Sequence, residues 1–362
     1  MRIQHRNIVR PFFNCTITTP VACLLVITVV LGFLWVQDKM AAPIPDPPRS
    51  FHYRFEVLKG FFAQSEDSTD DSNFDFLKED FGILHRKYDT DEDDKEKQGQ
   101  WPRFERFVRY LNEKSEDGES VKVLFLGRHG QGWHNVAESK YGTKNWDCYY
   151  SMLDGKDGIV WSDAVLTEVG QNQAKDVNGL WQRILPQGIP PPETYYVSPL
   201  TRTIETADLS FKGLDLPHDK PYRPYIKELL REALGVHTCD RRSTASHLLK
   251  GFPHITFEPN FSEPDVLWQA DYREPRSARQ YRLSQLLDDI FENDDGVFLS
   301  LTSHSGAIGS ILAAIGHREF ALQTGGVIPV LIRASKVAGE RTKPPKEPSE
   351  APPKCEEPPV DM

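Results

Sequence analysis

The strongest fold signal in this chain of 362 residues is Leu126-Gly127-Arg128-His129-Gly130-Gln131-Gly132-Trp133-His134-Asn135. It follows the mostly apolar residues 121–125, which predict a buried strand. An arginine and a histidine therefore stand at the carboxyl end of a strand, where open α/β sheets usually bind ligands. Nearby glycines allow close approach of the backbone to an anion. The stretch predicts a phosphate site with His129 as the nucleophile.

Two further segments carry matching residues at predicted strand ends. Residues 296–302 predict a second strand, which leads through Ser303-His304-Ser305-Gly306 into a helix-like run. Residues 194–197 predict a third strand, and the helix that follows holds Arg202 in its first turn. Because the carboxyl ends of parallel strands lie at one edge of a sheet, two arginines and two histidines can converge there.

A carboxylic acid is offered by Glu228-Leu229-Leu230-Arg231-Glu232-Ala233-Leu234-Gly235, which we expect to form a loop. In phosphoryl transfer from a monoester, the leaving alkoxide needs a proton, and the water that completes hydrolysis must lose one. One glutamate can serve both steps. Glu228 and Glu232 are both candidates on the residues alone.

With these motifs, residues 52 to 335 resemble the histidine phosphatase (phosphoglycerate mutase-like) superfamily, within it the fungal phosphomutase-like branch. The resemblance implies a phosphohistidine at His129, and its register favours Glu232 over Glu228 as the proton donor. The catalytic residues that it implies are His129, Glu232 and His304, and the phosphate-binding residues are Arg128, Asn135 and Arg202. It also implies that Thr167 and Gly170 lie near the pocket.

Several of these residues have simpler explanations. Asn135 can cap the following helix instead of binding phosphate. His134 is either a second pocket histidine or a structural one. Arg231 is expected at the surface or in a salt bridge, and Arg241 and Arg242 bind either a second anionic group of the substrate or only solvent.

Other chemistries fit the sequence less well. No His-Glu-x-x-His frame or comparable ligand spacing is present, so we expect no metal. No Gly-x-x-x-x-Gly-Lys or Gly-x-Gly-x-x-Gly loop is present either, and no organic cofactor is expected. The glycine of a serine hydrolase elbow is missing before Ser303. The net charge of −10 argues against binding to nucleic acid.

Alternating strands and helices predict one three-layer α/β/α domain with a mostly parallel sheet over residues 51–336. Helices are predicted around residues 101–111, 163–185 and 277–293 from their apolar spacing. Residues 236–275 lack a clear period and contain four prolines, which indicates an insertion near the site. The Pro-, Lys- and Glu-rich residues 337–362 predict a disordered tail.

The amino terminus carries a separate signal. Residues 17–37 are almost wholly apolar and long enough to span a bilayer, which predicts a transmembrane signal anchor. Three arginines in residues 1–16 place that short segment in the cytoplasm, and a Pro-rich linker, residues 38–50, leads to a lumenal or extracellular domain. The alternatives are a cleaved signal peptide and a cytoplasmic protein whose N-terminal segment is a gene-model artefact.

The function predicted from these residues is a phosphomonoester phosphatase that acts on a small phosphorylated substrate. Its enzymatic rival is a phosphoglycerate mutase-type phosphomutase, but the mutase flanks of this family are replaced here by Gln131-Gly132 and by residues 230–235. A non-catalytic phospho-ligand binding module at a membrane is the other alternative, although no pocket residue is missing. The sequence does not predict the substrate or the oligomeric state.

Overall fold

The computed structural model describes residues 50–91, 99–355 and 359. The predicted N-terminal segment 1–16, the predicted transmembrane helix 17–37, and all but the last residue of the predicted linker 38–50 lie outside these residues. Within the described ranges, no helix has both the length and the apolar composition that crossing a membrane requires.

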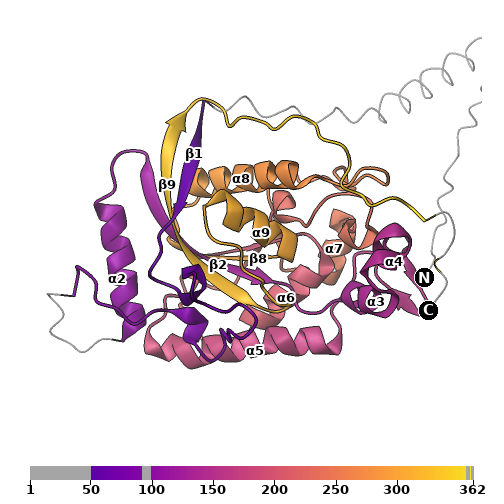
Figure 1. Cartoon of the computed structure of the whole chain (residues 1–362). Coiled ribbons are helices and arrows are strands. Elements are labelled where there is room, and N and C mark those ends of the chain that lie inside the picture. The colour runs from indigo at the N-terminus through magenta and orange to yellow at the C-terminus, as the bar shows by residue number, and fades with distance from the viewer. Residues whose placement is uncertain (1–49, 92–98, 356–358, 360–362) are drawn as a thin grey trace, which may run out of the picture. The chain divides into compact units, whose positions relative to one another are not determined.

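The centre of the domain is a seven-stranded sheet (Figure 1). From edge to edge its strands are β1 (Phe51–Val57), β9 (Val327–Ala338), β2 (Glu119–Arg128), β8 (Phe298–Ser303), β5 (Thr194–Val197), β6 (Pro224–Ile226) and β7 (Thr256–Phe257). Strand β9 is antiparallel to both of its neighbours, and the other pairs are parallel. A separate short pair joins β3 (Gly155–Lys156) to β4 (Ile159–Val160). The predicted mostly parallel sheet is confirmed.

Helices cover both faces of this sheet. One face carries α8 (Arg276–Asn293) and α9 (Ser305–Ala314), and the other carries α2 (Gln100–Glu113), α5 (Glu168–Ile184) and α6 (Thr201–Phe211). The remaining helices are α3 (Trp133–Tyr141), α4 (Thr143–Cys148), α7 (Ala245–Gly251) and the short η1 (Ala63–Ser65), η2 (Asp80–Gly82), η3 (Tyr150–Met152), η4 (Leu185–Gln187), η5 (Glu228–Leu230) and η6 (Thr238–Asp240). This arrangement is the three-layer sandwich expected from the sequence.

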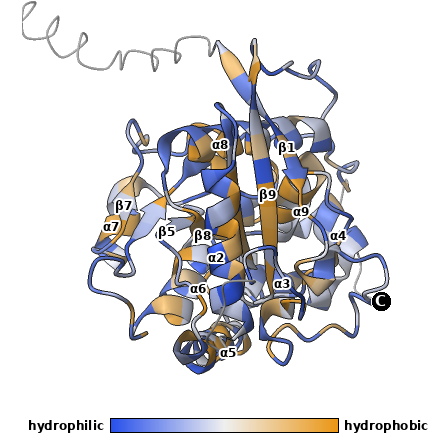
Figure 2. Cartoon of the chain, turned by 90° about the vertical axis from the view of Figure 1, so that its left-hand side faces the viewer, coloured by the Kyte–Doolittle hydropathy of each residue, from blue (hydrophilic) through white to orange (hydrophobic). Residues whose placement is uncertain are grey.

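The side chains of strand β2 explain why helices pack on both faces of the sheet. Val123 and Phe125 pack against α2 and α5, whereas Leu124 and Leu126 pack against α8 and α9. A strand that is apolar on both faces must be covered on both, which is the usual condition of parallel sheets. In Figure 2, β8 and β9 accordingly run as largely orange strands through the middle of the domain.

The predicted helices match α2, α5 and α8, with one difference at the start of α5. This helix begins at Glu168 and not near residue 163, because the Thr167 side chain caps it by accepting a hydrogen bond from the Gly170 N–H. The predicted insertion, residues 236–275, contains η6 and α7 and contributes β7 to the edge of the sheet.

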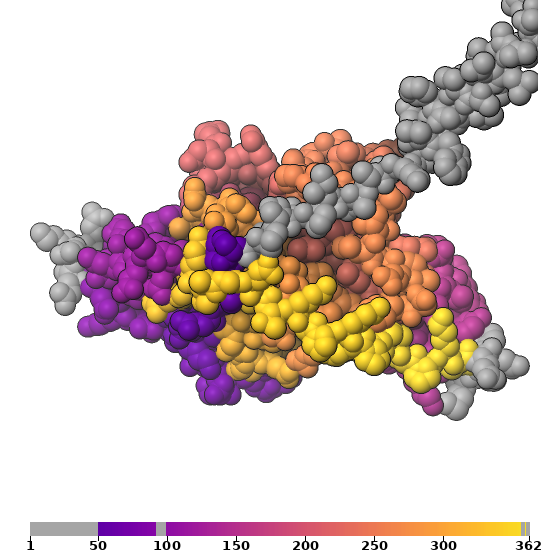
Figure 3. Space-filling view, turned by 90° about the horizontal axis from the view of Figure 1, so that it is seen from above, coloured from indigo at the N-terminus to yellow at the C-terminus, as the bar shows by residue number. Residues whose placement is uncertain are grey.

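The carboxyl-terminal residues are where the structure corrects the sequence analysis. The sequence predicts a disordered tail over 337–362, and the first two residues of that range belong to β9 instead. Residues 337 and 338 end β9, and residues 339–355 form neither helix nor strand but run across the surface as the yellow segment of Figure 3. A disulfide between Cys355 and Cys148 fixes the far end of this segment, a link that composition does not reveal.

Candidate active site

Three adjacent strands bring the predicted phosphate residues to one edge of the sheet. Arg128 at the end of β2 lies opposite Ser303 at the end of β8, and the His129 N–H donates to the Ser303 carbonyl at 3.0 Å. The N–H of Ser198, after β5, donates to the Thr302 carbonyl at 3.0 Å. The parallel register therefore places the segments that hold His129, His304 and Arg202 side by side.

His129 is buried, and its hydrogen bond defines its tautomer. Its Nδ1 lies 2.7 Å from the Gly130 carbonyl oxygen. Because a carbonyl only accepts, Nδ1 carries the proton and Nε2 keeps its lone pair. Burial, with Arg202 next in importance, lowers the pKa of His129 well below its usual range, so the ring is neutral near pH 7. A neutral ring with a free Nε2 lone pair is the nucleophilic form.

The loop after His129 is packed tightly against the start of α5. A Cβ at Gly130 would clash with the backbone of Gly170, and a Cβ at Gly170 would clash with the carbonyl of Gln131. The Gly130 N–H donates to Thr206 Oγ1 at 3.0 Å, and the Gln131 N–H donates to Gln173 Oε1 at 2.8 Å. These glycines thus permit close contact between two backbone segments and fix the position of His129.

Arg202 is fully buried and held by acceptors from the insertion. Its Nη1 donates to the Cys239 carbonyl at 2.6 Å, and its Nη2 donates to Asp240 Oδ1 at 3.0 Å. Arg273 Nη1 donates to the other oxygen of Asp240 at 2.8 Å. These two guanidinium groups overcome the effect of burial and lower the pKa of Asp240 to about 2. One carboxylate is therefore shared by two arginines, the buried Arg202 and the partly buried Arg273.

His304 orients Arg202 through one ring nitrogen. Its Nδ1 lies 3.3 Å from Arg202 Nη2, and its Nε2 lies 2.8 Å from Ser198 Oγ. A guanidinium only donates, so Nδ1 accepts and the Nε2–H donates to the serine. Burial and the charge of Arg202 lower the pKa of His304 well below its usual range. Its ring centroid is 5.2 Å from that of His129, which places it in the same site.

The site carries donors that await an acceptor. Arg128 Nη1 donates to the Leu322 carbonyl at 2.8 Å. Within the described residues, however, Nε of Arg128, Nε of Arg202 and Nδ1 of His134 are buried without a hydrogen-bond partner. Burial lowers the pKa of Arg128, while the carboxylate of Glu232 acts in the opposite direction. The Nε–H groups of Arg128 and Arg202 are buried donors without partners, which is costly, and an anion would satisfy them.

Glu232 lies beside the start of α9. Its Oε2 accepts the Gly306 N–H at 2.9 Å, and its Oε1 accepts the Ala233 N–H at 2.9 Å. Glu228 is engaged elsewhere, in ion pairs of 2.7 Å with Arg231 and 2.8 Å with Arg242. Both oxygens of the Glu228 carboxylate thus accept hydrogen bonds from guanidinium groups. The geometry therefore favours Glu232 over Glu228, as the resemblance implies.

The remaining predicted residues divide between the site and the scaffold. The Asn135 side chain accepts the Gly132 N–H at 3.0 Å, so it does cap α3. His134 is buried, and its ring centroid is 5.2 Å from that of His129, so it belongs to the site. Arg231 is buried in ion pairs, which is one of its two expected settings. Arg242 is buried in an ion pair with Glu228 and is therefore not the solvated side chain that one alternative gave. Arg241 is partly exposed and pairs with Asp154.

Sequence reasoning misses three residues that contact the candidate site, namely Asp240, Arg273 and Ser198. They act through contacts between distant segments, and no local pattern marks them. His237, Cys239 and Asp240 could bring ligand atoms within 4.8 Å of one another. Asp240, however, already pairs with Arg202 and Arg273, and this positive surrounding does not suit a metal cation.

Comparison with known proteins gives consistent relatives. Residues 154–324 match the model of the histidine phosphatase superfamily (branch 1), a span that includes Arg202, Glu232 and His304. The "Probable phosphoglycerate mutase" of Arthroderma benhamiae is 52% identical over 281 residues, 77% of this chain and 84% of that protein. "Phosphomutase-like protein 3" of Candida albicans is 36% identical over 304 residues, 83% of this chain and 85% of that protein.

A third relative extends the same pattern to another yeast. "Probable phosphoglycerate mutase PMU1" of Saccharomyces cerevisiae is 33% identical over 240 residues, which cover 61% of this chain and 81% of that protein. All three relatives are aligned over most of their length. This chain belongs to the histidine phosphatase superfamily, in its fungal phosphomutase-like branch.

Proposed function

We propose that this chain is a phosphomonoester phosphatase that works through a phosphohistidine at His129. One observation carries the proposal: a buried, neutral histidine whose Nε2 keeps its lone pair stands among arginines with unpartnered N–H groups. Phosphoryl transfer needs mainly positioning and fixed positive donors around the equatorial oxygens. Arg128 and Arg202 supply those donors, and Asn135 has an amide nitrogen left to add to them.

The first half-reaction transfers the phosphoryl group to the enzyme. Nε2 of His129 attacks phosphorus in line with the ester oxygen, and the bond between phosphorus and that oxygen breaks. The leaving alkoxide takes its proton from Glu232, while His304 holds the Arg202 fork in place. The Nδ1–H bond to the Gly130 carbonyl stabilises the positive charge that develops on the ring.

The second half-reaction returns the enzyme to its starting state. Glu232, now a carboxylate, takes a proton from a water molecule that attacks the phosphohistidine. The bond between phosphorus and Nε2 breaks, and inorganic phosphate leaves. A single glutamate thus acts first as an acid and then as a base.

A phosphomutase is the second candidate, because relatives of this chain bear that name. It would share the first half-reaction but return the phosphoryl group to the substrate. The replacement of the mutase flanks by Gln131-Gly132 and residues 230–235 favours hydrolysis.

A substrate panel tests the proposal and separates the candidates. The full chain is incubated with sugar phosphates, nucleotides, a phosphopeptide and a phosphoglycerate, and both phosphate release and isomer formation are measured. We expect phosphate release that His129→Ala abolishes and that His247→Ala, a change at an exposed histidine, leaves intact. Isomer formation without phosphate release would make the chain a mutase. If neither phosphate nor an isomer forms, both candidate functions are overturned.

We also propose that residues 17–37 anchor the chain in a membrane with the domain on the lumenal or extracellular side. The apolar length of that segment and the arginines before it support this orientation. The Cys148–Cys355 pair adds support, since disulfides persist in oxidising compartments. The sequence Asn260-Phe261-Ser262 is an N-glycosylation acceptor that is usable only in that compartment. Flotation with membranes, together with a glycosidase-sensitive mobility shift lost in Asn260→Gln, is the expected result. Recovery in the soluble fraction without such a shift would contradict it.

A further inference from the structure

The carboxyl-terminal segment 339–355, here called the C-terminal strap, follows a defined path across the domain. Near its start, Arg341 binds Asp288 on α8 and the Tyr53 carbonyl on β1. Further along, the Ser349 Oγ accepts the Arg273 N–H at 2.8 Å, and the Glu350 N–H donates to the Arg273 carbonyl at 3.2 Å. The strap thus crosses α8 and binds the end of the insertion (Figure 3).

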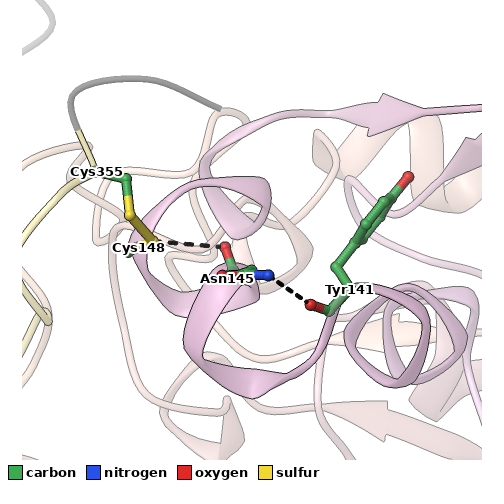
Figure 4. Close-up of a disulfide and its surroundings, with 4 residues drawn as sticks. All are labelled: Tyr141, Asn145, Cys148 and Cys355. Atoms are coloured by element: carbon green, nitrogen blue, oxygen red, sulfur yellow. Dashed lines mark hydrogen bonds between the residues drawn. A yellow bond between two sulfur atoms is a disulfide. The ribbon is translucent and has the colours of Figure 1, made fainter. Parts of the chain in front are cut away.

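The far end of the strap is attached to helix α4. Cys355 forms a disulfide with Cys148, and its N–H donates to the Cys148 carbonyl at 3.0 Å. Cys148 ends α4, whose Asn145 side chain binds back to the Tyr141 carbonyl on α3 (Figure 4). The same helix places Trp146 against His237, with ring centroids 6.2 Å apart. The strap therefore joins α4 to the insertion.

The residues that the strap binds also hold the loop of Glu232. Arg273 Nη1 donates to the carbonyls of Ala233 at 3.0 Å and Gly235 at 2.8 Å. A Cβ at Gly235 would clash with the carbonyl of Tyr272, so the two segments are in close contact. Helix α8 also holds this loop, since Arg282 donates to the carbonyls of Arg231 at 3.1 Å and Glu232 at 3.0 Å. Arg273 adds the support for the residues that follow Glu232.

Arg273 links the same segment to the phosphate side of the site. It forms an ion pair with Asp240, and the same carboxylate also pairs with Arg202. Arg273 therefore contacts the strap through its backbone and the site through its side chain. It touches neither substrate nor reacting atoms in the proposed mechanism and acts as a positioning residue.

We infer that the C-terminal strap is a redox-sensitive support of the active site, which acts through Arg273 to hold the loop of the proton donor Glu232. This inference rests on the proposed function. With the disulfide closed, the strap is held at both ends of its path. When a dithiol reduces it, the S–S bond takes up two electrons and two protons, two thiols form, and the dithiol becomes a disulfide. The strap then keeps the ion pair of Arg341 with Asp288 near its start and several exposed hydrogen bonds further along, which compete with water.

The test uses the full chain and compares esters with different leaving groups. The value of kcat/KM reports steps up to departure of the leaving group, so it senses Glu232. An alkyl phosphate needs protonation of its leaving oxygen, whereas an aryl phosphate with an acidic phenol hardly does. We expect a dithiol to lower kcat/KM for the alkyl ester about tenfold, with a much smaller effect on the aryl ester, and reoxidation to restore it.

The matched control is the double variant Cys148→Ser, Cys355→Ser, which keeps the other three cysteines, Cys15, Cys23 and Cys239. It should show the lowered alkyl activity without a dithiol and no further response to one. A dithiol response that persists in this variant would assign the effect to another cysteine and overturn the inference. An equal loss of activity on both esters would also overturn the inference, because a general loss of structure lowers activity whatever the leaving group is. No loss on either ester would overturn it as well.

Hydrogen exchange separates failure of this inference from failure of the proposed function. If the oxidised chain hydrolyses no ester, the proposed function fails. The inference about the strap is then tested by the hydrogen-exchange rates of the amides of residues 233–236. Faster exchange of these amides on reduction, with unchanged exchange in β2 and β8, would support the strap. Unchanged exchange at residues 233–236 would contradict it.

Discussion

The two sides of the site are built differently. On the phosphate side, Arg128, His129 and His304 follow adjacent strands, and the loop after His129 is locked by glycine contacts with α5. On the leaving-group side, Glu232 stands in a loop held by Arg273 and, beyond it, by the C-terminal strap. The first arrangement comes from the sheet, and the second from hydrogen bonds between segments far apart in the sequence.

This difference matches the chemistry that each side serves. The phosphoryl group is the same in every substrate, and strand ends in a packed sheet hold their side chains firmly. The leaving group differs from one substrate to another, and irregular backbone can vary without disturbing the core. We therefore expect changes on the phosphate side to affect all substrates and changes on the other side to select among them.

The largest effect should come from Arg202→Ala. It removes a buried donor of the proposed phosphate pocket and leaves Asp240 with Arg273 alone, so we expect kcat to fall by about 10² to 10³ for every phosphomonoester. Arg241→Ala is the control, since Arg241 is partly exposed and pairs with Asp154. Steady-state kinetics on an alkyl and an aryl ester check this. A loss of kcat for only one of the two esters would contradict the expectation that changes on the phosphate side affect all substrates.

Glu232→Gln should have a smaller and selective effect. We expect kcat/KM to fall by about 10² for an alkyl phosphate, because the proton donor is lost, and much less for an aryl phosphate. Glu228→Gln serves as the control: it weakens a buried ion-pair group and should lower the melting temperature without selecting the leaving group. Equal losses on both esters in Glu232→Gln would remove Glu232 from the role of acid.

The two sides also differ in how far sequence could predict them. Arg128, His129, Arg202 and His304 follow apolar strands or begin helices, so local pattern places them at one sheet edge. Glu232 needed the family register, because Glu228 is equally plausible until its two arginines are seen.

Long-range pairings escaped prediction altogether. Cys148 and Cys355 are separated by 207 residues, and the Asp240–Arg273 pair joins two ends of a segment without periodicity. Neither pairing leaves a local signal, since it is the fold that brings the partners together. For the same reason Arg231 and Arg242 resemble surface residues in the sequence and are buried in the structure.

Stability should depend on pH through the buried histidines of the phosphate side. Burial lowers the pKa of His129, His134 and His304 well below 6.5. Below pH 6.5 the unfolded chain thus binds more protons than the folded one. The free energy of unfolding therefore decreases as the pH is lowered. We expect a loss of about 1 kcal/mol per histidine between pH 7.5 and 5.5, measured by urea unfolding. His129→Asn should show a shallower dependence, and a flat profile in both proteins would contradict the burial of neutral rings.

The smallest effect should come from Asn135→Ala. Loss of the bond from the Gly132 N–H should lower the free energy of unfolding by about 1 kcal/mol. If its amide nitrogen also binds phosphate, kcat/KM should fall several-fold for alkyl and aryl esters alike. Asn293→Ala, which removes an exposed side-chain contact on α8, is the matched control for both measurements. A loss restricted to the alkyl ester would place Asn135 on the leaving-group side.

The most direct test of the central claim is to trap the phosphoenzyme. The full chain is mixed with a labelled phosphomonoester, quenched under alkaline conditions within one turnover, and digested for mass spectrometry. We predict one acid-labile, base-stable phosphoryl group on the peptide that contains His129, absent from His129→Ala. Turnover with no phosphoenzyme, or with the label on another residue, would contradict a phosphohistidine mechanism at this site.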